Sequence, residues 1–136
     1  MPIKSFFKLT LFNAIQLGKK VTSVIIIDDD QDSVESLDYL LKLKGIDVIG
    51  VGYNGKDAVT LYRKHNPDTV LLDLLMPEYD GHYAVEEISK LDPNAKVIVV
   101  SGSLDHRTDE IAKHKIVHSV VTKPFDADEL IKKILN

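Results

Sequence analysis

The chain has 136 residues, 44% of them hydrophobic and 28% charged, which is enough for one domain with a buried core. No apolar run approaches the roughly 20 residues that a membrane-spanning helix needs. Because there is no cysteine, disulfides and thiolate metal sites are excluded, and a reducing, cytoplasmic location is expected. The net charge of −4 argues against direct binding to nucleic acids.

Positive charge is concentrated at the start of the chain. Residues 1–22 carry four lysines and no acidic residue, so the rest of the chain has a net charge of −8. We predict an amphipathic helical extension over residues 1–22 and a main domain over residues 23–136. Packing on that domain and self-association into a homodimer are the favoured roles, while an anionic membrane surface and a passive upstream segment are the alternatives. The predicted apolar stripe consists of Ile3, Phe7, Leu11 and Ile15, widened by Phe6 and Phe12.

Short apolar runs alternate with amphipathic stretches along the main domain. Residues 24–27 are apolar at every position, as expected of a strand that is covered on both faces. Regular alternation of strands and helices predicts an α/β fold, with a five-stranded parallel sheet and helices on both of its faces. The predicted elements are strands at 24–27, 46–51, 69–72, 97–100 and 117–121, and helices at 32–44, 56–65, 83–91, 105–114 and 127–135.

Polar residues follow four of these five strands. Because the carboxyl ends of parallel strands share one edge of the sheet, ligands of such folds bind there. Crowded carboxylates repel each other and attract a hard cation such as Mg²⁺, while a lysine and a hydroxyl can bind phosphoryl oxygens. The set indicates phosphoryl transfer, with an aspartate as the covalent acceptor. Its members are Asp28, Asp29 and Asp30 after the first strand, Asp73 after the third, Ser101 after the fourth and Lys123 after the fifth.

Four motifs at these strand ends resemble the signature of response-regulator receiver domains. The resemblance extends from Ser23 to Asn136. It implies a flavodoxin-like sheet with strand order 2-1-3-4-5. The motifs are Ile25 to Asp30, Leu71 to Pro77 followed by Asp80-Gly81, Val99 to Gly102, and Thr122 to Phe125.

The resemblance also implies a role for each polar group at this edge. A cis peptide bond between Lys123 and Pro124 would help to orient the lysine. Receivers often have an aromatic residue three positions before that lysine, where this chain has Val120, so the aromatic form of the switch is left open. The implied roles are phosphoryl acceptor for Asp73, switch hydroxyl for Ser101, phosphate-binding cation for Lys123, and a Mg²⁺ site formed by the acidic pair Asp28 and Asp29, Asp73 and the backbone carbonyl of Leu75.

The implied function is a phosphorylation-dependent signalling switch. A histidine kinase or phosphotransfer protein would supply the phosphoryl group, and a downstream protein would read the resulting change of shape. Such a domain is not an enzyme in the usual sense, because it catalyses only its own phosphorylation and dephosphorylation. The alternative from another class is a binding or dimerisation module that works without phosphorylation, although no residue of the expected site is missing.

Two further patterns in the sequence suggest other functions. Asp28-x-Asp30 after an apolar strand resembles haloacid-dehalogenase phosphatases, in which Asp28 would be the nucleophile, but the chain is short for that family. Residues 50–55 fit the G-x-G-x-x-G pattern of dinucleotide-binding folds. That pattern belongs to the first strand-to-helix turn, which is acidic here, so we expect Gly50 and Gly52 in an edge strand and Asn54-Gly55 in a turn.

Overall fold

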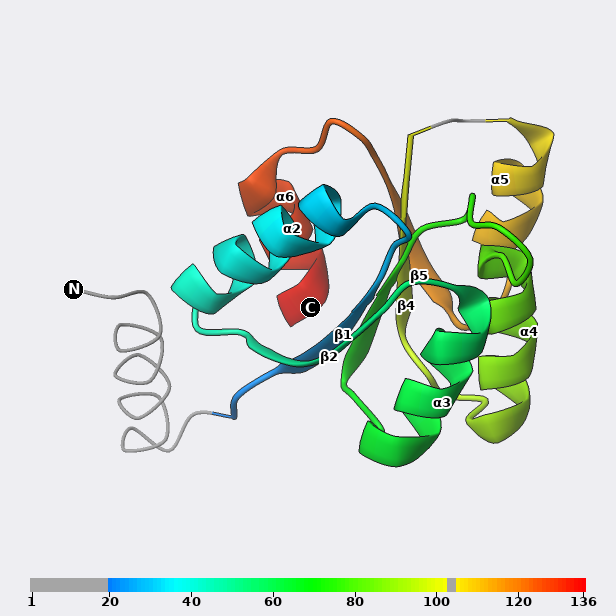
Figure 1. Ribbon diagram of the computed structural model, residues 1–136, viewed down its shortest axis with the longest axis horizontal. Helices are drawn as coiled ribbons and strands as arrows, with labels where there is room; N and C mark the ends of the chain where they lie inside the picture. Colours follow the sequence, from blue (N-terminus) through cyan, green and yellow to red (C-terminus); the bar gives the residue numbers. More distant parts are fainter. Residues whose placement is uncertain (1–19, 103–104) are drawn as a thin grey trace.

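The computed structural model describes residues 20–102 and 105–136 (Figure 1). The predicted extension therefore lies outside the described residues up to position 19, and it stays a prediction. Strands and helices alternate throughout the described part. They are β1 (Ser23–Ile27), α2 (Gln31–Leu43), β2 (Asp47–Gly52), α3 (Gly55–His65), β3 (Thr69–Leu72), α4 (Gly81–Leu91), β4 (Val97–Ser101), α5 (His106–Ala112), β5 (Val117–Thr122) and α6 (Ala127–Leu135).

The strands form one parallel sheet in the order β2-β1-β3-β4-β5, which confirms the predicted topology (Figure 1). The register between β1 and β3 pairs Ile27 with Leu72. The residues that follow them, Asp28 and Asp73, therefore leave the sheet side by side, and the Asp73 N–H donates to the Ile27 carbonyl at 2.9 Å. Strand pairing thus brings together two acids that lie 45 positions apart in the sequence.

Helices cover both faces of the sheet, with α2 and α6 on one and α3, α4 and α5 on the other (Figure 1). Side chains alternate between the faces along β1, so that Ile25 and Ile27 contact the three-helix side while Val24 and Ile26 contact the two-helix side. Both faces are therefore buried, which explains why the strand is apolar at every position. Among the described residues, no helix is both long and apolar enough to cross a membrane.

Helix ends follow their capping residues. The carboxylate of Asp30 accepts the N–H of Asp32 at 3.1 Å, so Asp30 is the N-cap of α2. Helix α5 ends at Ala112, two residues before the predicted His114. The reason is local, because the His114 ring accepts the Ile116 N–H at 3.3 Å and the His114 carbonyl accepts the Val117 N–H at 3.0 Å. These bonds close a turn into β5.

Glycines 50 and 52 lie in β2, the edge strand beside β1, as the sequence predicted. A Cβ atom at position 52 would come within 2.7 Å of the Asp57 Cβ and 2.9 Å of the Ile27 Cδ1. Close packing of α3 on the edge strand therefore requires glycine at position 52. Asn54 caps α3 by accepting the Asp57 N–H at 2.9 Å. The glycine-rich stretch thus serves the packing and capping of α3.

Candidate functional site

Three carboxylates meet at the carboxyl edge of the sheet. One oxygen from each of Asp28, Asp29 and Asp73 lies within 4.8 Å of the other two. Asp28 and Asp73 are buried and Asp29 is exposed, so the cluster opens to solvent on one side. The Asp30 N–H donates to Asp28 Oδ1 at 3.0 Å and fixes that side chain. Closely spaced carboxylate oxygens of this kind suit a small, hard divalent cation such as Mg²⁺.

Lys123 brings a positive charge to the same cluster. Its Nζ donates to Asp28 Oδ2 at 2.8 Å, and its backbone N–H donates to the Ser101 carbonyl at 2.8 Å. The peptide bond between Lys123 and Pro124 is cis, as the resemblance implied. Burial lowers the pKa of Lys123, but the hydrogen bond to Asp28 and the nearby negative charges outweigh it, so the pKa is raised overall. The ammonium group therefore stays charged at neutral pH.

The ionisation of Asp73 is strongly affected by its surroundings. Burial raises the pKa of Asp73 to about 6. The charge of Lys123 lowers this pKa and the charges of Asp28 and Asp29 raise it. Ionising this carboxylate beside two others is unfavourable. A cation bound between them would offset the repulsion among their negative charges.

Ser101 ends β4 and is fully buried. It pairs in register with Thr122, the residue before Lys123, so the ends of β4 and β5 deliver a hydroxyl and an ammonium to one edge. Ser101 also lines a small pocket together with Leu74, Leu75 and the α5 residue Thr108. Ser101 is therefore next to both the loop that follows Asp73 and the first turn of α5.

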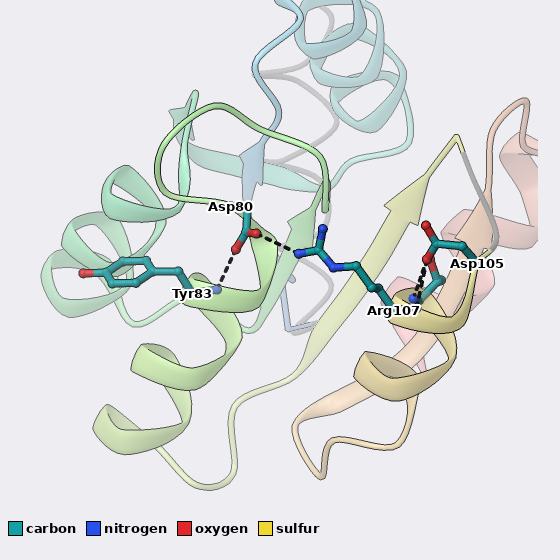
Figure 2. Close-up of polar contacts among 5 residues, drawn as sticks. Asp80, Tyr83, Asp105 and Arg107 are labelled. Carbon is teal, nitrogen blue, oxygen red and sulfur yellow. Dashed lines mark hydrogen bonds and ion pairs between the residues drawn. The ribbon is translucent and has the colours of Figure 1, made fainter.

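The loop from Asp73 to Asp80 is held at several points. The Gly55 N–H donates to the Tyr79 carbonyl at 2.6 Å, which ties the loop to α3. Asp80 Oδ1 accepts the Tyr83 N–H at 3.0 Å and Oδ2 accepts from Arg107 Nη2 at 3.1 Å (Figure 2). Sequence analysis missed Arg107, because nothing in the order of residues indicates a partner 27 positions away. Through these contacts α3, α4 and α5 all support the loop.

A parallel sheet in this order, with acids and a lysine at its carboxyl edge, defines a receiver domain of two-component signalling systems. The family "Response regulator receiver domain" matches residues 24–135, and the chain belongs to it. Its members are regulatory domains rather than classical enzymes. Among curated proteins, the chain is 33% identical over 118 residues to the chemotaxis protein CheY of Thermotoga maritima and 34% identical over 116 residues to CheY of Bacillus subtilis. These alignments span 87% and 83% of this chain and 96% and 97% of those proteins.

Solved structures show the same fold. The chain matches a structure titled as the CheX-CheY-BeF3-Mg+2 complex of Borrelia burgdorferi with a TM-score of 0.78 at 28% identity, covering 84% of this chain and 87% of that one. It matches a LuxR-family DNA-binding response regulator of Staphylococcus aureus with a TM-score of 0.78 at 33% identity, covering 85% and 97% of the two chains. The flavodoxin-like topology predicted from the sequence is therefore confirmed.

Proposed function

We propose that this chain is a cytoplasmic, phosphorylation-dependent switch that accepts a phosphoryl group on Asp73. The donor would be a phosphohistidine on a histidine kinase or phosphotransfer protein, and the output would be a contact with another protein. One observation carries the proposal: Asp28, Asp29 and Asp73 converge within 4.8 Å, and the Lys123 ammonium lies 2.8 Å from the first of them. This arrangement offers a nucleophile, oxygen ligands for a cation and a fixed positive charge in one place.

In the proposed reaction, a carboxylate oxygen of Asp73 attacks the phosphorus of the donor. The O–P bond forms as the P–N bond breaks, and the imidazole leaves with the electron pair. Lys123, already oriented by Asp28, would pair with one phosphoryl oxygen, and the Ser101 hydroxyl would donate to another. Mg²⁺, held by Asp28, Asp29, Asp73 and the backbone carbonyl of Leu75, would neutralise charge on the phosphoryl oxygens.

Signalling would follow from the position of Ser101. Ser101 shares a small pocket with residues of the loop that follows Asp73 and with Thr108 of α5, so a shift of its hydroxyl toward a phosphoryl group would change how α5 packs. Val120, at the position that receivers often fill with an aromatic ring, is a partly buried core residue beside β4. The switch would therefore act through α5 and the β4–β5 edge without a moving ring, by shifting the population between two arrangements.

The test is the intact mass of the protein after incubation with acetyl phosphate, with and without Mg²⁺. We expect one added phosphoryl group that needs Mg²⁺ and is absent from Asp73→Asn. Asp109→Asn, which changes an exposed acid of α5, is the matched control and should be phosphorylated normally.

Two outcomes would overturn the proposal in different directions. An adduct that persists in Asp73→Asn but disappears in Asp28→Asn would favour a phosphatase-like reaction with Asp28 as the nucleophile. No adduct under any condition would favour a receiver-like binding module that works without phosphorylation.

A further inference from the structure

An apolar groove runs beneath α2, beginning at the acid cluster. Its volume is about 500 Å³, within the range of roughly 300–1,000 Å³ typical of ligand pockets. The end near the sheet edge has a charged rim formed by Asp28, Asp32, Asp73 and Lys123. The remainder is lined mainly by apolar side chains from β1, α2, β3, β4 and the β5–α6 loop, including Ile26, Leu37, Leu40, Leu71, Val100 and Phe125. Of these, Leu40 and Phe125 are partly exposed and supply the apolar surface that faces solvent, while the other four are buried.

Small side chains on α2 help to explain the groove. Ser33 and Ser36 both line it, at positions where larger residues would fill the space between α2 and the β5–α6 loop. Leaving such an apolar surface in contact with water is unfavourable by about 25 cal/mol for each Å². An occupant that presents apolar side chains is therefore expected.

Residues 1–19 have the composition of such an occupant. They contain three of the four phenylalanines of the chain, and their apolar positions recur at the spacing of one helix face. They have lysines and no acidic residue, whereas residues 23–136 carry a net charge of −8. The acids on the groove rim, Asp28, Asp32 and Asp73, outnumber its one lysine. The apolar side chains and the positive charge of residues 1–19 are thus both complementary to the groove.

The point of attachment is also favourable. The Asp47 N–H donates to the Thr22 carbonyl at 2.9 Å, and the Ile46 N–H donates to the Leu41 carbonyl at 3.0 Å. The start of β1 therefore lies beside the C-terminal end of α2, which is the Leu40 end of the groove. Along α2 the groove lining runs from Asp32 to Leu40, a length of about 12 Å. Nineteen residues span about 28 Å even as a helix, so they reach its far end.

We propose that residues 1–19 dock in the groove of their own chain. The stripe of Ile3, Phe7, Leu11 and Ile15 would cover the apolar lining, and the lysines would lie near the acidic rim. A covalent tether gives the segment an effective concentration on the order of millimolar, which favours its own groove over that of a second, equally acidic domain. The docking does not depend on the phosphorylation proposed above.

Because the chain has no cysteine, one spin label can be placed at a single engineered position. Ser5→Cys is suitable, since position 5 lies off the apolar stripe. In the ¹⁵N-labelled full chain, we expect the label to broaden the amide signals of Ser36, Leu37 and Phe125, but not those of Glu87 and Lys90 on the opposite side of the sheet. The matched control adds Phe7→Asp and Leu11→Asp, which should abolish the broadening while the domain signals stay in place.

Three results would overturn the proposal. In a mixture of ¹⁵N-labelled chains without a spin label and spin-labelled chains without ¹⁵N, broadening of the ¹⁵N signals would show that the groove binds the segment of a second copy. Equal broadening with and without the two aspartates would show that the stripe does not dock. Absence of broadening, together with flotation of the full chain on anionic vesicles, would assign the segment to a membrane surface.

Discussion

Arg107 and Asp80 form an ion pair that joins the first turn of α5 to the N-terminus of α4, with 3.1 Å between Nη2 and Oδ2 (Figure 2). The same carboxylate caps α4 through its other oxygen, which accepts the Tyr83 N–H. Asp80 therefore links the loop that follows Asp73, the following helix and α5.

The two contacts of Asp80 can be separated by mutation. Asp80→Asn keeps a capping oxygen but loses the ion pair, so it should lower the free energy of unfolding by at most about 0.5–1 kcal/mol, as is usual for exposed ion pairs. Asp80→Ala also loses the cap and should cost about 1 kcal/mol more. Urea unfolding of both variants measures the two costs. In a double-mutant cycle, Arg107→Gln should add nothing in the Asn background, and an equal added cost there would contradict the assignment.

Ionisation of Asp73 should make the metal-free protein less stable at neutral pH. Burial raises its folded pKa to about 6, from an ordinary value of 3.8, so the folded state holds a proton that the unfolded state releases. The stabilisation is complete below pH 3.8 and is lost as the pH rises through about 6. In buffer with a chelator at pH 7, Asp73→Asn should therefore be about 1–2 kcal/mol more stable than the wild type. Below about pH 4 the difference should shrink, as thermal unfolding at several pH values would show.

Addition of Mg²⁺ provides the matching control. A cation that binds only the folded wild type stabilises it in proportion to the logarithm of its concentration. Wild type should therefore gain stability with Mg²⁺, and Asp73→Asn should gain much less. Equal gains in both proteins would place the cation elsewhere.

Lys123 should control both the ionisation of Asp73 and its reactivity. Its charge lowers the pKa of Asp73, so Lys123→Met should raise that pKa above 6, as carboxyl ¹³C NMR can measure in metal-free protein. Loss of the cation should also slow phosphorylation by acetyl phosphate by about 10-fold or more. Lys132→Met, which removes a lysine from α6 away from the cluster, is the control. A normal phosphorylation rate in Lys123→Met would argue against a role in binding phosphoryl oxygens.

Much of the fold could be predicted from the sequence because its signals are local. Five apolar runs separated by amphipathic stretches specify buried parallel strands, and polar residues after those strands must share one edge of the sheet. The clustering of Asp28, Asp29 and Asp73 follows from that rule alone. The strand order and the cis bond before Pro124 came from the family resemblance, since no local pattern specifies either.

Other features depend on distances between residues far apart in the sequence. The pairing of Arg107 with Asp80 depends on how α4 and α5 lie side by side, which periodicity does not reveal. Likewise, Ser33 and Ser36 are unremarkable on a helix surface until the gap between α2 and the β5–α6 loop is known. The early end of α5 has a different, local cause, because two bonds at His114 compete with helical hydrogen bonding.

The backbone contact between Gly81 and Asp73 should limit what position 81 can hold. A Cβ atom there would lie 2.7 Å from the Asp73 carbonyl oxygen and 2.8 Å from the Leu74 Cα, and neither backbone atom can move without disturbing Asp73, the proposed acceptor. Gly81→Ala should therefore lower the free energy of unfolding by about 1–3 kcal/mol, although alanine has the better helix propensity.

Gly102 provides a comparison at the same edge of the sheet, because a Cβ atom built there has no other group of residues 20–102 and 105–136 within 4 Å. Gly102→Ala should change stability by less than about 0.5 kcal/mol. Thermal unfolding of both variants, together with their acetyl phosphate phosphorylation rates, tests the difference. If Gly81→Ala proved as stable as Gly102→Ala, the close approach of α4 to Asp73 would not constrain the site, and the loop would have to be more adaptable than its contacts with α3 and α5 indicate.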